Sequence, residues 1–115
     1  MLYIVVPVYN RVKDTLKILD AFAQQTYREY QVIVVNDGST DGTSEKVDQC
    51  FPSTKILNTL GDYWWSATIN EGGQYAISVG DQTYDYIMII NNDVDFPDDF
   101  LARMTKTMEG KKIGF

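Results

Sequence analysis

Short apolar runs alternate along the chain with longer segments in which apolar residues recur at steps of three and four. The runs are rich in β-branched residues and end at polar or glycine-containing segments, which is typical of strands buried in a parallel sheet. Steps of three and four place apolar side chains on one face of a helix. The predicted strands are residues 2–9, 31–35, 55–58 and 84–90, and the predicted helices are residues 12–25, 43–51, 66–80 and 97–108.

This alternation predicts one α/β domain over residues 1–115, with a Rossmann-like, mostly parallel sheet and helices on both of its faces. The final residues, KKIGF, are expected to begin another strand. Asn10 is expected to cap the first helix and Asp41 the second. Inside the third helix, the adjacent Gly72 and Gly73 indicate close packing or the close approach of a ligand.

Composition narrows the chemistry that this domain can perform. The 115 residues include one cysteine, Cys50, and no histidine. A disulfide framework, a Cys/His zinc site, and Ser-His-Asp or Cys-His catalytic machinery are therefore excluded within the chain. Sixteen Asp and Glu against ten Lys and Arg give a net charge of −6, which disfavours nucleic acid or an anionic membrane as a partner. An anionic ligand would need a local device, such as backbone donors or a metal ion.

Neither a membrane span nor a signal peptide is predicted. No apolar run approaches about 18 residues, and the first apolar stretch lacks a basic region and is interrupted by Pro7. We therefore expect a cytoplasmic setting.

Polar segments follow three predicted strands at the edge where open α/β sheets bind ligands, outside the carboxyl ends of the strands. They are residues 7–10, 36–42 and 91–95. In the last of them, Asp93 and Asp95 are two residues apart, so both carboxylates can face one hard cation, Mg²⁺ or Mn²⁺, that would also hold a diphosphate. The alternative is an ordinary turn before a helix.

The segment NDGSTDG offers Asp37 as an acceptor for a ring N–H, such as N3–H of uracil or thymine, and its glycines allow close approach. It matches neither a Walker A loop, nor G-x-G-x-x-G, nor an EF-hand loop, and the alternative is a surface turn. Tyr9 could lie against a base, whereas Pro7 is equally well explained as a strand terminator. Of the adjacent Trp64 and Trp65, one could border a sugar or base pocket instead of the core.

Taken in order, VPVYN, VVNDGSTDGT, WWSATINEGG and NNDVDFPDDF resemble the motifs of glycosyltransferase family 2, the inverting nucleotide-sugar transferases of GT-A fold. The resemblance covers essentially the whole chain and implies the N-terminal half of that fold. It also implies a UDP- or dTDP-type nucleotide diphosphate sugar as donor, a saccharide or lipid-linked acceptor, and a role in cell-surface polysaccharide biosynthesis. The Trp64-Trp65 segment is similar to that of members that use dTDP-rhamnose or related donors.

Carried over residue by residue, the resemblance implies a nucleotide site, a metal site and a sugar pocket. Asn36 stands where the family commonly has Asp, and its amide can still bond a base or a hydroxyl. The implied nucleotide-binding residues are Pro7, Tyr9, Asn10, Asn36, Asp37 and Asp93, the implied ligands of Mg²⁺ or Mn²⁺ are Asp93 and Asp95, and the implied sugar-pocket residues are Trp64 and Trp65.

Enzymes of this family need a second half that supplies the acceptor surface and the catalytic base, so the general base is expected beyond residue 115. We therefore expect the chain to be the nucleotide-binding half of a longer enzyme and to be inactive by itself. Any peripheral association with a membrane is expected to come from the part of that enzyme beyond residue 115. The main alternative is a non-catalytic nucleotide-sugar-binding or regulatory module. A nucleotidyltransferase would open with a Gly-rich, Arg-containing loop where this chain has PVYNRV, and a receiver domain would place its acidic pair after the first strand.

Overall fold

The computed structural model describes residues 1–61, 65–80 and 86–111. In this part of the chain, strands form one sheet in the order β3, β2, β1, β4, and every neighbouring pair is parallel. The elements are β1 (Leu2–Val8), α1 (Val12–Ala23), β2 (Tyr30–Asp37), α2 (Thr43–Cys50), β3 (Lys55–Thr59), α3 (Trp65–Val79), β4 (Tyr86–Ile89) and α4 (Phe100–Lys111). The predicted α/β architecture is confirmed.

Two predicted boundaries differ from the structure at the C-terminal end of the chain. Helix α4 begins at Phe100, three residues after Pro97, because the Phe100 N–H bonds the Pro97 carbonyl in a preceding turn. It continues to Lys111, which the sequence placed in a strand. The remaining residues of that predicted strand, 112–115, and residues 84–85 of the predicted fourth strand lie outside the described residues.

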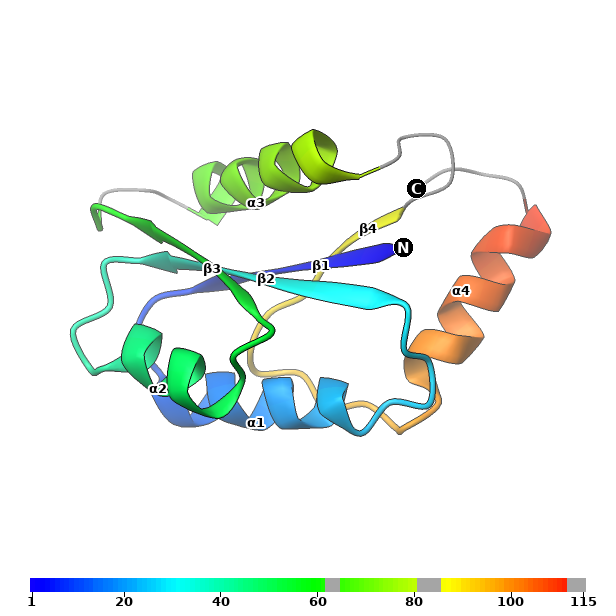
Figure 1. Ribbon diagram of the computed structural model, residues 1–115, viewed down its shortest axis with the longest axis horizontal. Helices are drawn as coiled ribbons and strands as arrows, with labels where there is room; N and C mark the ends of the chain where they lie inside the picture. Colours follow the sequence, from blue (N-terminus) through cyan, green and yellow to red (C-terminus); the bar gives the residue numbers. More distant parts are fainter. Residues whose placement is uncertain (62–64, 81–85, 112–115) are drawn as a thin grey trace.

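The helices form two layers around the sheet. Helices α1 and α2 cover one face, and α3 covers the other (Figure 1). Side chains alternate between the faces along β1, so that Ile4 and Val6 pack toward α1 and α2, whereas Val5 packs toward α3. This double cover explains why β1 is apolar at nearly every position.

Helix α3 approaches the sheet closely at one of its two adjacent glycines. A Cβ atom on Gly72 would lie 2.4 Å from Cγ1 of Val5 and 3.2 Å from Cγ2 of Val35, whereas a Cβ atom on Gly73 would meet nothing within 4 Å. Close packing is therefore confirmed for Gly72, and Gly73 takes no part in it.

Strand β4 is less buried than its apolar sequence predicts. Ile87 and Ile89 are 37% and 46% exposed. Within the described residues β4 pairs only with β1 and stands at the edge of the sheet. These two side chains are exposed because α3 lies mainly over β1 and β2 and leaves β4 largely uncovered.

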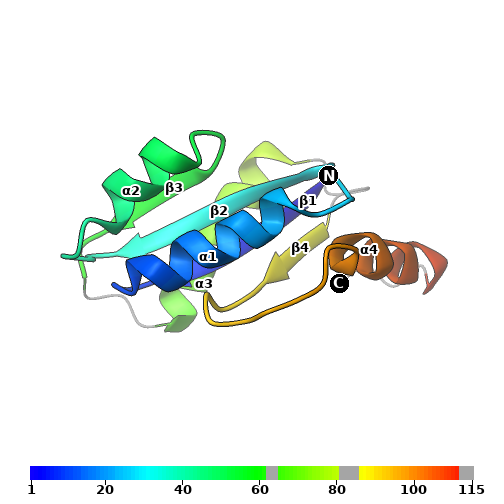
Figure 2. The ribbon, with the colours of Figure 1, turned by 90° about the horizontal axis from the view of Figure 1, so that it is seen from below.

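The chain reverses its direction across the sheet between β1 and β4. It first builds outward from β1 through β2 to β3, and then crosses over through α3 to reach β4 on the other side of β1. Such a reversal opens a crevice at the carboxyl ends of the two strands, where open α/β sheets bind ligands. The loops that follow β1, β2 and β4 all begin at this edge, which we call the carboxyl edge (Figure 2).

Candidate functional site

Asp37 is the last residue of β2 and is held in place by the end of β3. Its Oδ1 accepts a hydrogen bond of 2.6 Å from the Thr59 hydroxyl and one of 3.0 Å from the Gly61 N–H. Its side chain is buried, with 6% of the residue exposed. The predicted acceptor is therefore fixed at the carboxyl edge by two donors, one from the last residue of β3 and one from the loop that follows it.

Sequence reasoning missed Thr59 and Gly61. Thr59 lies directly beside Asp37 in the parallel register of β2 and β3, so a hydroxyl residue at the end of the third strand was the available signal. Gly61 lies against Gly38 of the loop after β2: a Cβ atom on Gly38 would lie only 2.5 Å from the Gly61 Cα, whereas a Cβ atom on Gly61 would lie 3.6 Å from the Gly38 Cα, which is ordinary contact. Both glycines have positive φ angles, of 72° and 94°.

Asn36 is buried, and its amide bonds other parts of the chain. Its Nδ2 donates to Oδ1 of Asn58 at 3.1 Å, and its Oδ1 accepts from the Ser39 N–H at 3.4 Å. The amide therefore ties β2 to β3 and shapes the loop after β2. Asn58 is a second partner on β3 that the sequence did not single out.

The loop after β1 turns sharply at two residues in the left-handed region. Asn10 and Arg11 have φ angles of 56° and 59°, a conformation that costs roughly 1–2 kcal/mol for most side chains and less for Asn. The predicted cap at Asn10 is wrong. Arg11 occupies the N-cap position of α1 and makes no side-chain cap bond, while Oδ1 of Asn10 accepts instead from the Thr40 N–H at 2.8 Å.

Three side chains, those of Asn10, Ser39 and Asp41, join the segment after β1 to the loop after β2, and we call their bonds across the two segments the loop clasp. The clasp includes the Asn10–Thr40 bond and a bond from the Asn10 N–H to the Ser39 hydroxyl at 2.7 Å. Oδ2 of Asp41 accepts from the Val12 N–H at 3.0 Å, and its Oδ1 accepts from the backbone and the hydroxyl of Thr43. Asp41 thus supports the first turns of both α1 and α2, because each of its oxygens serves a different helix.

These bonds stabilise the charged form of Asp41. The Thr43 hydroxyl contributes most, and the Val12 and Thr43 N–H groups add to it, so that the pKa of the Asp41 carboxyl lies below its ordinary value. The sequence predicted Asp41 as the N-cap of the second helix, but Gly42 occupies that position with a φ of 80° and Asp41 precedes it. The bond between Asp41 and Val12 spans 29 positions, which no local capping rule can detect.

Tyr9 and Pro7 lie at the end of β1, where the sequence placed them. Tyr9 is 60% exposed beside the loop clasp, and its ring is accessible to a ligand. Pro7 lies within β1, opposite Val35 of β2, and is partly buried. Of the predicted sugar-pocket pair, Trp64 lies outside the described residues, and of Trp65 the structure describes only its place at the start of α3.

Asp93 and Asp95 follow β4 and are both exposed. The loop that carries them runs back along α1 (Figure 2) and is tied to that helix by two contacts. Nδ2 of Asn92 donates to the Thr15 hydroxyl at 3.1 Å, and Oδ1 of Asp95 lies 3.3 Å from Nζ of Lys17 in an exposed ion pair.

Two exposed carboxylates suit a hard cation such as Mg²⁺ or Mn²⁺, which keeps several water or phosphate oxygens as further ligands. Among the described residues, no group of three or more Asp, Glu, Cys or His side chains could enclose a metal ion. The residues present therefore fit a partly hydrated metal shared with a bound phosphate, and Asp95 would have to leave Lys17 to reach it.

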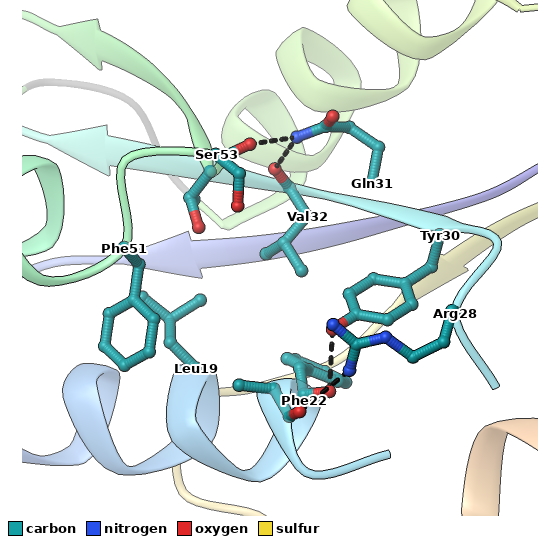
Figure 3. A pocket seen from close by; sticks show the side chains of 10 residues that line it. Leu19, Phe22, Arg28, Tyr30, Gln31, Val32, Phe51 and Ser53 are labelled. Atoms are coloured by element: carbon teal, nitrogen blue, oxygen red, sulfur yellow. Dashed lines mark hydrogen bonds between the residues drawn. The ribbon is translucent and has the colours of Figure 1, made fainter. Parts of the chain in front are cut away.

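A cavity of about 140 Å³ lies away from these residues, at the amino end of β2 (Figure 3). Its apolar wall includes Phe22, Val32 and Phe51. The Tyr30 hydroxyl donates to the Phe22 carbonyl, and the Gln31 amide donates to the Val32 and Ser53 carbonyls. These polar groups hold elements of the fold together, and the cavity contains none of the residues that the sequence predicted as a site.

Comparison with known proteins places the chain among glycosyltransferases. The profile of the family described as Glycosyl transferase family 2 matches residues 3–114. A relative from Rickettsia bellii (strain RML369-C), named an uncharacterized glycosyltransferase, is 32% identical over 114 residues, which cover 97% of this chain and 16% of the relative. The chain thus spans about one sixth of that relative's length.

Solved structures share the fold. The mannosyltransferase PcManGT from Pyrobaculum calidifontis, in complex with GDP-Man and Mn²⁺, has a TM-score of 0.79 at 24% identity, over 93% of this chain and 32% of its own. S. aureus TarS 1-349 in complex with UDP-GlcNAc has a TM-score of 0.74 at 21% identity, over 95% and 31%. A 4-diphosphocytidyl-2C-methyl-D-erythritol synthase has a TM-score of 0.73 at 18% identity, over 94% and 54%, so the fold alone does not choose a reaction.

No helix in the described part of the chain is both long and apolar enough to cross a membrane.

Proposed function

Because the chain belongs to glycosyl transferase family 2, we propose that it forms the donor-binding part of an inverting transferase that uses a UDP- or dTDP-type nucleotide sugar. One observation carries this proposal. Three polar segments far apart in the sequence begin at the carboxyl edge of three adjacent strands: Asp37 ends β2, Tyr9 directly follows β1, and Asp93 lies four residues after the end of β4. Structures of similar fold hold GDP-Man with Mn²⁺ and UDP-GlcNAc, which supports a nucleotide sugar as the ligand.

The nucleoside would bind around the ends of β1 and β2. Asp37 would accept a hydrogen bond from a ring N–H of the base, and the exposed Tyr9 ring would lie against the base. Pro7, Asn10 and Asn36 would contact the nucleotide through the backbone around them or shape the loops that do. The loop clasp keeps the segments after β1 and β2 at a fixed separation.

The diphosphate would bind near the loop after β4. Asp93 and Asp95 would hold Mg²⁺ or Mn²⁺ there, and the two tryptophans, Trp64 and Trp65, would border the sugar. When bound, the metal would offset the charge that develops on the departing nucleoside diphosphate.

Transfer requires a general base that deprotonates the acceptor hydroxyl. The hydroxyl would attack the anomeric carbon on the face opposite the diphosphate, which inverts the configuration there. We place this base, together with the surface for a saccharide or lipid-linked acceptor, in a longer protein beyond residue 115. The chain by itself would bind donor and metal without transferring the sugar.

Isothermal titration calorimetry with UDP, dTDP and GDP tests the proposal. We expect binding in the presence of Mn²⁺, and a loss of at least about tenfold in affinity when EDTA is added or when Asp93→Ala and Asp95→Ala are combined, since about 1.4 kcal/mol corresponds to tenfold. The pair Asp20→Ala and Asp48→Ala removes the same charge from exposed sites on α1 and α2 and should leave binding unchanged. Equal affinity with and without EDTA would exclude the metal assignment, and the absence of binding would exclude the donor site.

A further inference from the structure

We propose that Thr59 is a positioning residue for Asp37 and thereby sets a preference for bases that carry a ring N–H. This inference rests on the proposed function, because it concerns the base of the nucleotide. It starts from the hydrogen bond between the Thr59 hydroxyl and Oδ1 of Asp37, at 2.6 Å.

The end of β3 is built to hold the Asp37 carboxylate in one orientation. Thr59 pairs with Asp37 in register, and the strands lie side by side (Figure 1). The Gly61 N–H binds the same oxygen from a second direction, at 3.0 Å. Hydrogen bonds to an ionised group are among the stronger ones in proteins, and burial to 6% exposure leaves Asp37 little room to turn.

Replacing the hydroxyl by a methyl group would force the carboxylate to move. A carbon approaches a carboxylate oxygen only to about 3.3–3.6 Å, whereas the Thr59 hydroxyl oxygen lies at 2.6 Å. Thr59→Val keeps the β-branched shape that suits a strand and displaces Asp37 by close to 1 Å. A displacement of about 1 Å is enough to spoil a directional contact with a ligand.

The orientation of Asp37 affects bases differently. Uracil and thymine carry a proton on N3 and guanine carries one on N1, so each presents a ring N–H to a carboxylate. Cytosine presents a lone pair at N3, which a carboxylate repels. A correctly oriented Asp37 therefore favours UDP over CDP, and this preference depends on Thr59.

The test measures the affinities of UDP and CDP by calorimetry, with Mn²⁺ present, for the wild-type chain and for Thr59→Val, Thr59→Ser and Asp37→Asn. Serine retains the O–H donor and should keep the UDP affinity within about threefold. We expect Thr59→Val to lower the affinity for UDP by about tenfold, as for a lost hydrogen bond to a charged group, and to change the affinity for CDP by less than about threefold. Thr107→Val, which removes a hydroxyl on α4, is the matched control and should change neither affinity.

The UDP-to-CDP ratio separates positioning from loss of structure, because unfolding would weaken both ligands equally. If Asp37→Asn lowers the ratio and Thr59→Val does not, Asp37 binds the base without Thr59 and our inference is wrong. If Asp37→Asn leaves the UDP-to-CDP ratio unchanged, or if the wild-type chain does not bind UDP, the proposed contact between Asp37 and the base is wrong, and the inference about Thr59 falls with it. Circular dichroism at the titration temperature confirms that each variant is folded.

Discussion

Replacing Gly72 by alanine tests how closely α3 lies against the sheet. The new Cβ atom would stand 2.4 Å from Cγ1 of Val5 and 3.1 Å from its Cγ2, where ordinary contact begins at 3.4 Å. Val5 is fully buried, and its β-branched side chain has few alternative rotamers. Helix α3 would therefore have to move away from β1 by about 1 Å or force Val5 into a strained rotamer.

Overpacking of this kind costs about 1–3 kcal/mol. Alanine also raises helix propensity by about 1 kcal/mol over glycine, so Gly72→Ala should change the free energy of unfolding by between about 0 and −2 kcal/mol. Gly73→Ala gains the same propensity with nothing within 4 Å and should stabilise the protein by about 1 kcal/mol. The propensity gain cancels between the two variants, so their difference of about 1–3 kcal/mol measures the clash alone.

Urea denaturation followed by far-UV circular dichroism measures this difference. Midpoints are compared at a shared slope, because extrapolated free energies carry larger errors than midpoint shifts. If Gly72→Ala and Gly73→Ala stabilise the protein equally, α3 does not lie against Val5 and the described packing is wrong.

Two further predictions concern the loops at the carboxyl edge. Gly38→Ala should lower the free energy of unfolding by about 2–5 kcal/mol in urea denaturation, because its Cβ atom would lie 2.5 Å from the Gly61 Cα at a positive φ. Gly42→Ala is also at positive φ, but its Cβ atom would meet only Oε2 of Glu45 at 4.0 Å, so it should cost only about 1–2 kcal/mol, and equal losses would contradict the contact. Asp41→Asn should cost about 1 kcal/mol at pH 7, because an amide keeps only one acceptor oxygen, whereas both Asp41 oxygens accept hydrogen bonds. Since the folded pKa of Asp41 is depressed, its contribution is present above the ordinary carboxyl pKa and disappears as the pH falls through the folded pKa. The urea midpoints of Asp41→Asn and wild type should therefore converge as the pH is lowered below the ordinary carboxyl pKa, whereas a constant gap would refute the charge effect.

The order of strands and helices follows from the sequence because it depends on local patterns. β1 and β2 are buried on both faces, and their apolar runs identify them without any knowledge of their neighbours. The exposure of Ile87 and Ile89 could not be predicted, since an apolar strand at a sheet edge has the same local sequence as a central one.

The site depends on hydrogen bonds between residues far apart in the sequence, and local sequence patterns do not predict these partners. The sequence identified Asp37 as a polar residue at a strand end, but its partner Thr59 is 22 positions away. The capping rule predicted that the Asn10 side chain bonds the first turn of α1, because the rule considers only N–H groups that are close in sequence. In the structure Asn10 bonds Thr40, 30 positions away, and Asp41 takes over the first N–H of α1.

The loop clasp also bears on how this acidic chain would hold a diphosphate. With a net charge of −6, the chain must provide either backbone donors or a cation for such an anion, and helix N-termini are the usual source of donors. Four backbone N–H groups in the loops after β1 and β2 already bond side chains, and they belong to Asn10, Val12, Ser39 and Thr40. The carboxylate of Asp41 moreover stands at the start of α1, where it would repel a phosphate. In the proposed donor site the diphosphate would therefore bind at the loop after β4, with a cation on Asp93 and Asp95, and for this reason we expect EDTA to abolish most of the nucleotide affinity.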